Sequence, residues 1–256
     1  MLDRKEIEKY GPAGFHLAQK EKDYVQHWVL SFFSRTGLSA VFKGGTCLQK
    51  AYGLPRYSED LDFTADGEIE PDFGAISSFL SSAGFSGLAW KRKESRVSVS
   101  AKLRFQGPLY NGKSVSEGAV LLEFSRREKV LLKPQPVLIM PPYQDILPYQ
   151  LRVMAKEEIA AEKVRALLSR KSARDLFDLY FLVHQKTGLD RALVDEKLRY
   201  YGVTFEFAQL EKKVGRIEEI WKTEMSELTP ALLPYETVAK AVLAEAKKQL
   251  AAPKRS

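Results

Sequence analysis

The sequence predicts an α+β fold with a mixed sheet flanked by helices, followed by a helical bundle. From Arg96 to Phe105, apolar and polar residues alternate, which is typical of a half-buried strand. Residues 13–36 instead place apolar side chains at helical spacing and end at Gly37. After about residue 145 nearly every segment has helical periodicity. We therefore expect a sheet-containing domain over residues 1–145 and a helical domain over residues 146–256.

The expected elements follow a simple order along the chain. After the helix at 13–36 come a short strand at Val41-Phe42-Lys43, a turn at Gly44-Gly45 and a short helix from Thr46. Further strands are expected at 59–64, 96–105, 120–125 and 130–140, with a helix at 71–83. Pro141-Pro142-Tyr143-Gln144-Asp145 is the candidate linker. Beyond it, helices are expected at 156–170, 173–186, 191–200, 207–226 and 235–250.

The composition is that of an ordinary globular protein, with 256 residues of which 45% are hydrophobic. No apolar run approaches the roughly 18 residues that a membrane-spanning helix needs. The first ten residues lack the apolar stretch of a signal peptide. We therefore expect a cytoplasmic protein with no membrane partner. The single cysteine, Cys47, excludes an internal disulfide and is expected to be buried.

The net charge is +7, from 40 basic and 33 acidic residues. This excess suits a polyanionic partner such as RNA, although charge alone does not identify one. The basic residues include a run of strand positions, and two interpretations of it remain open. The run either contacts a nucleic-acid backbone or is simply solvated. Its members are Arg96, Lys102 and Arg104, with Lys91, Arg92 and Lys93 nearby.

Two carboxylates occur at alternate positions in Asp60-Leu61-Asp62-Phe63. On a strand such residues point to the same face, so Asp60 and Asp62 should project together. Two adjacent carboxylates repel each other unless a cation or a proton intervenes. Mg²⁺, or Mn²⁺, would remove that repulsion, and Mg²⁺ favours one or two carboxylates together with substrate phosphates. The alternative is an acidic strand end without a metal.

A glycine turn precedes these acids in Lys43-Gly44-Gly45-Thr46. Glycines allow close backbone approach to a phosphate, and the helix start expected here offers N–H groups and a positive dipole end. The Thr46 hydroxyl could add a hydrogen bond to the same anion. An ordinary tight turn would explain the glycines equally well in isolation. The combination with Asp60 and Asp62 favours a nucleotide triphosphate bound beside a metal.

The helical half contains a second set of charged candidates. Lys163 emerges among apolar neighbours at i−4, i−3, i+3 and i+4, so its ammonium either binds a phosphate or reaches water at its tip. Ser172 and Asp175 resemble a capping box, which gives Asp175 a structural explanation. Asp178 is surrounded by apolar residues and needs a partner. That partner could be Arg174 in an ion pair, or Asp178 could orient Lys163 or accept a substrate proton.

Two motif blocks together resemble the AbiEii/AbiGii toxin family of nucleotidyltransferases. The first contains Lys43-Gly44-Gly45-Thr46, Leu48, Lys50, Tyr52, Arg56 and Ser58-Glu59-Asp60-Leu61-Asp62-Phe63, and the second contains Glu162-Lys163-Val164-Arg165-Ala166, Arg170 and Arg174-Asp175-Leu176-Phe177-Asp178-Leu179. The resemblance implies a polymerase β-like domain followed by a helical part that completes the active site. It also implies Mg²⁺-dependent nucleotidyl transfer from an NTP.

The resemblance carries further expectations. Related proteins act as toxins of toxin–antitoxin or phage-defence systems, and some add nucleotides to the 3′ acceptor end of tRNA. A separately encoded antitoxin is therefore an expected partner. Sites of the polymerase β type usually carry a third carboxylate on a neighbouring strand, for which Glu123 is the candidate metal ligand. Glu123 could equally pair with Arg126 or Arg127.

The leading functional hypothesis is an enzyme that moves NMP from an NTP onto RNA, most simply the 3′ end of a tRNA. Asp60 and Asp62 would hold Mg²⁺, while Lys43, Gly44, Gly45, Thr46 and Lys163 would hold the nucleotide, and Asp178 would assist catalysis. Alternatives are nucleotidylation of a protein or a small molecule, and a non-catalytic protein that binds RNA or an antitoxin. A metal-dependent phosphohydrolase is less favoured, since no histidine-rich cluster is present.

Overall fold

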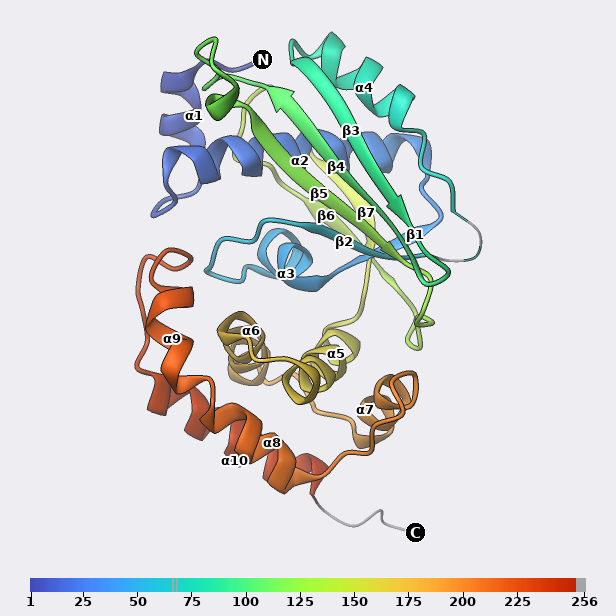
Figure 1. The fold of residues 1–256 in the computed structure, drawn as a ribbon, viewed down its shortest axis with the longest axis vertical. Coiled ribbons are helices and arrows are strands. Elements are labelled where there is room, and N and C mark those ends of the chain that lie inside the picture. Colours follow the sequence, from blue (N-terminus) through green and yellow to red (C-terminus); the bar gives the residue numbers. More distant parts are fainter. Residues whose placement is uncertain (66, 68, 252–256) are drawn as a thin grey trace. The chain divides into compact units, whose positions relative to one another are not determined.

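The computed structural model describes residues 1–65, 67 and 69–251, and the chain divides into two compact units (Figure 1). The first unit comprises Met1–Val130 and Pro134–Val153. The second comprises Leu131–Lys133 and the chain from Met154 onward. Each unit has its own buried apolar core. In the described part of the chain, no helix is long and apolar enough to cross a membrane.

A seven-stranded mixed sheet forms the centre of the first unit, with strand order β3-β4-β5-β2-β1-β7-β6. The strands are β1 (Ala40–Lys43), β2 (Leu61–Ala65), β3 (Ser86–Glu94), β4 (Ser98–Gln106), β5 (Gly118–Ser125), β6 (Gln135–Ile139) and β7 (Tyr149–Val153). The pairs β1–β7 and β2–β5 are parallel, and the other pairs are antiparallel. The predicted α+β class with a mixed sheet is confirmed.

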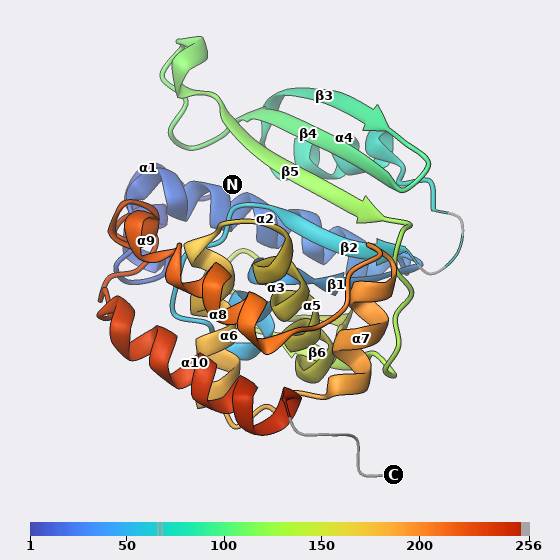
Figure 2. The same cartoon turned by 60° about the horizontal axis from the view of Figure 1, so that its bottom comes forward.

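Four α-helices accompany this sheet within the described residues, together with a 3₁₀ turn at Ser114–Ser116. The helices are α1 (Arg4–Tyr10), α2 (Leu17–Thr36), α3 (Gly44–Tyr52) and α4 (Phe73–Ser82). Helix α2 packs against β5 and β7, and Figure 1 shows it behind the outer strands. Helix α4 packs against β3, where the Trp90 indole N–H donates to Ser77 Oγ at 2.9 Å. Figure 2 shows the same sheet from a second direction.

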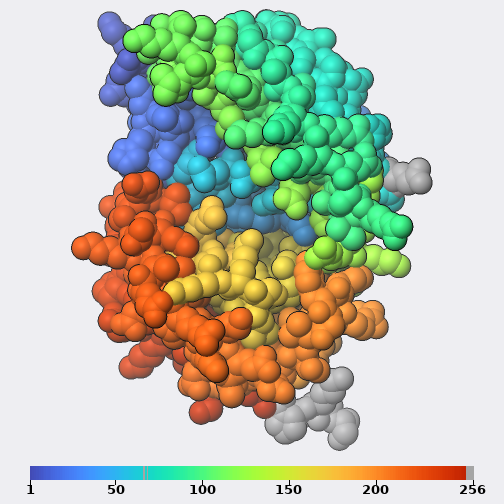
Figure 3. All heavy atoms as spheres, viewed as in Figure 1, coloured from blue at the N-terminus to red at the C-terminus, as the bar shows by residue number. Residues whose placement is uncertain are grey.

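The register of the central strands separates the sheet into two chemically different faces. Phe63 is paired with Phe42 on one side and with Phe124 on the other, and its ring stacks on that of Phe124 at 5.0 Å. Phe33 of α2 contacts both Phe63 and Phe124, so this face is the core face. Because successive strand residues point to opposite faces, the residues between these phenylalanines point the other way. Figure 3 shows the outer strands of the sheet uncovered on the side that faces the viewer.

The second unit consists of helices. They are α5 (Lys156–Ser169), α6 (Ala173–His184), α7 (Arg191–Arg199), α8 (Phe207–Gly215), α9 (Glu218–Met225) and α10 (Tyr235–Leu250). Helix α5 packs against α6, α7 and α8, and α6 packs against α9 and α10. The single helix expected at 207–226 is two helices, since α8 ends at Gly215, a residue that weakens helices.

Several elements differ from the sequence-based expectation. Helix α1 and strands β3 and β7 were not expected. Strand β3 lies at the sheet edge with most of its residues exposed, so it lacks the alternation that marks a half-buried strand. Strand β7 is five residues long and places the start of the second unit at Met154, later than the expected boundary at residue 145. Strand β6 is shorter than 130–140 because residues 131–133 belong to the second unit.

Candidate active site

The acidic residues of the first unit lie side by side on the sheet face opposite the phenylalanine core. Asp62 of β2 is in register with Glu123 of the parallel strand β5 and with Lys43 of the antiparallel strand β1. Neighbouring strands are roughly 4.8 Å apart, so these three residues form one row across the sheet, and we call the part with Asp62 and Glu123 the acid row. Asp60 lies immediately before β2, which begins at Leu61 rather than at residue 59.

The glycine turn lies directly against this row. Gly44 has φ +77°, a left-handed conformation that side chains rarely adopt, and a Cβ added there would lie 2.5 Å from Asp62 Oδ2. A Cβ added at Gly45 would lie 2.5 Å from Arg56 Nη2 and 2.8 Å from Ser58 Oγ. Both positions therefore require glycine, because the backbone passes close to other residues on each side. The Asp62 carboxylate contacts the start of α3, where the positive end of the helix dipole favours a negative charge.

Thr46 is fully buried and holds the acidic segment in place. Its hydroxyl donates to the backbone carbonyl of Asp60 at 2.5 Å and lies 2.9 Å from Ser58 Oγ. The hydroxyl therefore already has partners within the protein. The expected contact between the Thr46 hydroxyl and a phosphate stays a prediction. Thr46 joins the first turn of α3 to the entrance of β2.

Two buried glutamine contacts complete this attachment. Gln26 of α2, which is fully buried, donates through Nε2 to the carbonyls of Ser58 at 3.0 Å and of Glu59 at 2.7 Å. Gln49 of α3 accepts from the Ser58 N–H at 3.2 Å. Together with Thr46, these side chains hold three consecutive carbonyls in front of β2. Neither glutamine was predicted from the sequence, although a polar residue on the apolar face of the 13–36 helix was a detectable signal.

A buried ion pair fixes α3 on α2 behind the glycine turn. Asp23 Oδ1 lies 2.6 Å from Lys50 Nζ, and both side chains are 1% exposed. Asp23 also accepts from Gln49 at 3.1 Å and from the Tyr143 hydroxyl at 2.9 Å. Burial raises the pKa of the Asp23 carboxyl, but Lys50 outweighs it together with the other partners, so the net pKa is lowered. Burial lowers the pKa of nearby His27 to about 3, so His27 is neutral near pH 7.

The second unit places Lys163 between two buried carboxylates. Its Nζ lies 2.9 Å from Asp175 Oδ1 and 2.7 Å from Asp178 Oδ2. The Lys163 side chain is 10% exposed, whereas those of Asp175 and Asp178 are 1% and 0% exposed. The protein itself therefore supplies counter-charge to this ammonium. The contact with Asp178 agrees with the expected alternative in which Asp178 orients Lys163, and the phosphate role of Lys163 stays a prediction.

Asp175 has a different structural role from the one the sequence predicts. Ser172 precedes α6 without a side-chain capping hydrogen bond, so the expected capping box does not form. Asp175 instead accepts from Arg170 Nε at 2.7 Å in addition to its contact with Lys163. Burial raises the pKa of the Asp175 carboxyl, but Lys163 and Arg170 outweigh it and hold the pKa below its usual range. Asp175 is thus a permanent anion near pH 7.

A second buried charge cluster lies on the preceding turn of α5. Lys197 of α7 is fully buried, with Nζ 2.7 Å from Glu158 Oε1 and 3.0 Å from Glu162 Oε1. The Glu158 carboxylate also accepts from the backbone N–H groups of Leu131 and Leu132, each at 2.9 Å. This cluster ties α7 and residues 131–133 to α5, the helix that carries Lys163. This cluster was not predicted from the sequence.

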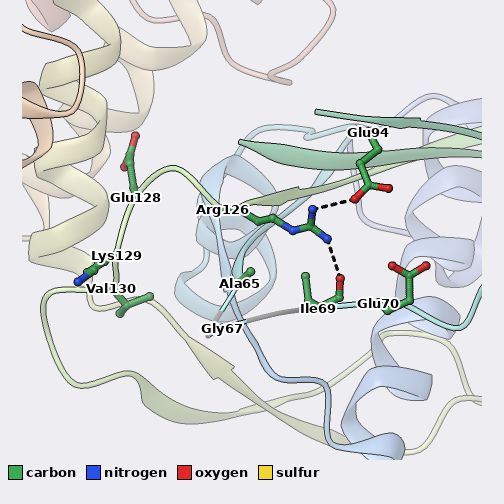
Figure 4. Close-up of a pocket in the computed structure, with 9 residues that line it drawn as sticks. All are labelled: Ala65, Gly67, Ile69, Glu70, Glu94, Arg126, Glu128, Lys129 and Val130. Carbon is green, nitrogen blue, oxygen red and sulfur yellow. Dashed lines mark hydrogen bonds and ion pairs between the residues drawn. The ribbon is translucent and has the colours of Figure 1, made fainter. Parts of the chain in front are cut away.

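A cavity of about 980 Å³ opens elsewhere on the first unit (Figure 4). It is lined by residues that follow β2 and β5 and by the end of β3, and includes none of the candidate site residues. Its charges largely satisfy one another, since Arg126 contacts Glu94 at 2.8 Å and the Ile69 carbonyl at 3.0 Å. This cavity is therefore separate from the candidate residues at the glycine turn.

In this mixed α+β fold, a glycine turn starts helix α3 and lies against Asp62 of strand β2, as the motifs of a nucleotidyltransferase predict. The chain belongs to the AbiEii nucleotidyl transferase toxin family of type IV toxin–antitoxin systems, whose pattern matches residues 31–246. The protein is therefore a nucleotidyltransferase, as the motifs predict. This family assignment implies an NTP substrate and a separate antitoxin.

Solved structures with the same fold come from two bacteria. MenT4, a nucleotidyltransferase toxin from Mycobacterium tuberculosis, has a TM-score of 0.62 at 20% identity, over 96% of this chain and 88% of that chain. A candidate nucleotidyltransferase from H. pylori has a TM-score of 0.61 at 20% identity, over 89% and 92% of the two chains. JHP933 from Helicobacter pylori has a TM-score of 0.55 at 20% identity, over 89% of each chain. No curated protein matches the chain.

Proposed function

We propose that this nucleotidyltransferase transfers NMP from an NTP to the 3′ end of an RNA, with a tRNA as the acceptor and Mg²⁺ as the cofactor. The observation that carries the proposal is the register of Asp62 with Glu123 beside Gly44. In the reaction, the terminal hydroxyl oxygen of the acceptor bonds to the α-phosphorus of the NTP. The bond to the β-phosphate oxygen breaks, pyrophosphate leaves and the hydroxyl proton is released.

The acid row suits a divalent cation chemically. Asp62 and Glu123 are paired in register on neighbouring strands. The backbone of Asp60, just before β2, is held by a hydrogen bond from the Thr46 hydroxyl. Hard cations such as Mg²⁺ take oxygen ligands and leave coordination positions for water and phosphate. Within the described residues, no three carboxylate, histidine or cysteine side chains already converge as a metal cluster. Asp60, Asp62 and Glu123 do not form such a cluster, so their assignment as two ligands and a third acid rests on sequence position and strand register, with the nucleotide phosphates supplying the remaining oxygens. The bound cation would offset the charge of these phosphates.

The start of α3 is suited to the phosphates themselves. Lys43 at the N-cap makes no side-chain hydrogen bond to the first turn, and the N–H groups of a helix N-terminus attract anions. The absence of side chains at Gly44 and Gly45 lets Asp62 and Arg56 lie close to this backbone. Lys43 is in register with Asp62 and would add positive charge on the same face. Thr46 contributes through its position in this turn.

For the helical unit, we propose that Lys163 binds a nucleotide phosphate and that Asp178 orients it. The support is the 2.7 Å contact that fixes the ammonium against a fully buried carboxylate. A lysine held this way loses little side-chain freedom on binding. Asp175 and Arg170 hold the other side of the same ammonium and act as positioning residues. Asp178 is also the candidate acceptor of a substrate proton.

The experiment is incubation of the purified protein with Mg²⁺, each of the four labelled NTPs in turn, and total RNA. We expect label on small RNA, dependence on the metal, and loss of transfer in Asp62→Asn and Glu123→Gln. Glu8→Gln is the control, because Glu8 is an exposed acid on α1 outside the row. Label on protein would favour protein nucleotidylation. Phosphate release without transfer would favour hydrolysis, and binding without chemistry would overturn the enzymatic proposal.

A further inference from the structure

The acid row continues across the sheet into a basic surface. Glu123 of β5 is in register with Ser100 of β4, and Ser100 is in register with Lys93 of β3. On the adjacent row, Leu121, Lys102 and Lys91 occupy the same three strands. The residues of this second row lie two positions from the first, and so share its face. Lys91, Lys93 and Lys102 therefore point to the face that carries Asp62 and Glu123.

The charged side chains of strands β3 and β4 are distributed unequally between the two faces of the sheet. Arg92 lies between Lys91 and Lys93 and so points to the core face, where it pairs with Glu70 at 2.5 Å and Glu94 at 2.6 Å. Lys91, Lys93 and Lys102 are all exposed. Among the residues that the structure describes, these three lysines have neither an ion pair nor a side-chain hydrogen bond. One face is therefore neutralised, whereas the acid face carries three uncompensated positive charges.

We infer that this lysine surface, formed by Lys91, Lys93 and Lys102, binds the phosphodiester backbone of the RNA acceptor. The inference rests on the proposed transfer to RNA and assigns the acceptor a specific path over β3 and β4. Three strand spacings separate Asp62 from Lys93, which is roughly 14 Å. The lysines therefore contact phosphates upstream of the terminal nucleotide, and the 3′ end reaches the acids.

The chemistry of this surface favours backbone contact over base recognition. The other residues of the face include Ala89, Ser98, Ser100, Arg104 and Leu121, and none of these is an aromatic ring on which a base could stack. Lysine is a flexible point charge that suits phosphate rather than a particular base edge. Figure 1 shows no helix in front of β3 and β4 on this side, so an extended strand of RNA can lie on them. Binding here should depend strongly on salt and weakly on sequence.

The test is direct binding of a labelled single-stranded oligoribonucleotide of about 12 nucleotides, without NTP or metal. The variant is the triple substitution Lys91→Gln, Lys93→Gln and Lys102→Gln. Each phosphate contact to a single strand contributes about 0.7 to the slope of log affinity against log salt. The triple variant should therefore lower that slope by about 2 and weaken binding roughly tenfold or more at 50 mM salt.

Two matched variants separate a specific surface from a general effect of charge. Lys5→Gln, Lys113→Gln and Lys222→Gln remove the same charge from exposed lysines elsewhere and should leave the salt slope near that of the wild type. Arginine at positions 91, 93 and 102 retains the charge and should retain binding. Equal losses in both glutamine triples, or unchanged binding in the first, would overturn the inference and leave the surface to solvent or to an acidic protein.

The binding assay also distinguishes this inference from the proposed function. RNA binding that depends on the lysine surface, without any transfer of label, would support the surface and refute the transferase reaction on RNA. If the triple variant binds RNA and transfers label as the wild type does, the transferase reaction is supported and the lysine surface is refuted. The substituted lysines are exposed and make no ion pair among the described residues, so thermal unfolding of the variant should match that of the wild type.

Discussion

Substitution of Gly44 by alanine tests how closely the glycine turn and the acid row are connected. An alanine at φ +77° costs about 1–2 kcal/mol of stability, because the left-handed conformation brings Cβ close to the backbone. The new Cβ would also lie 2.5 Å from Asp62 Oδ2, a distance that real atoms do not adopt. The Asp62 carboxylate must therefore move. A displacement of about 1 Å at a reacting centre can reduce a rate by about 100-fold.

Gly53 provides a matched control at the other end of the same helix. It follows α3 with φ +79°, and nothing lies within 4 Å of an added Cβ. Gly53→Ala therefore carries the same backbone cost without displacing a functional group. We expect both variants to lose about 1–2 kcal/mol in urea unfolding, and only Gly44→Ala to lose about 100-fold in label transfer. Comparable activities in the two variants would refute the argument that Gly44 is needed for the position of Asp62.

Three further predictions address the buried polar contacts. Thr46→Val should lower stability by about 1–3 kcal/mol and raise the Mg²⁺ concentration needed for transfer, since the Asp60 carbonyl loses its donor, whereas Thr46→Ser should retain both properties. Lys163→Met should lower the free energy of unfolding in urea by about 3–5 kcal/mol, because it leaves Asp175 and Asp178 buried without this cation. Adding Asp178→Asn to the same chain should restore part of the loss. If the losses of the two substitutions simply add, the pairing is contradicted. The lowered pKa of Asp175 stabilises the fold above the ordinary value of 3.8, and this stability is lost as the pH falls through the lowered pKa; Asp175→Asn should therefore flatten the acid limb of unfolding free energy against pH.

The sequence was informative where one residue type has few explanations. The alternation around Ser98–Gln106 predicted β4, and the position of Asp62 on a strand beside a glycine turn was recognisable from spacing alone. The register that brings Glu123 next to Asp62 joins strands far apart in the chain, and no local pattern encodes it. Strand β3 was missed for a related reason, because an exposed edge strand needs no apolar alternation.

The polar contacts behind the site show a second kind of limit. Thr46, Lys163 and Asp175 were each recognised as notable. Of their partners only Asp178 was expected beside Lys163, because a hydroxyl or ammonium can satisfy the same need with ligand or protein. The structure gives the Thr46 hydroxyl to the Asp60 carbonyl and the Lys163 ammonium to two carboxylates. Partner choice depends on distances between helices, which sequence spacing does not provide. Sequence patterns therefore indicate that a polar group is important before they indicate what it contacts.

The buried charges of the helical unit are difficult to explain by stability alone. Removing an ion pair such as Lys197 with Glu158 and Glu162 from water costs several kcal/mol per ion, and well-packed apolar residues often stabilise a core better. Apolar contacts are non-directional. Lys197 of α7, by contrast, contacts two glutamates of α5 and so orients α7 against α5. Lys163 follows Glu162 directly on α5, so the contacts that orient this helix also set the position of Lys163. Its ammonium is held between Asp175 and Asp178. If Lys163 binds a phosphate as proposed, a requirement to position its ammonium would explain why both clusters are charged rather than apolar.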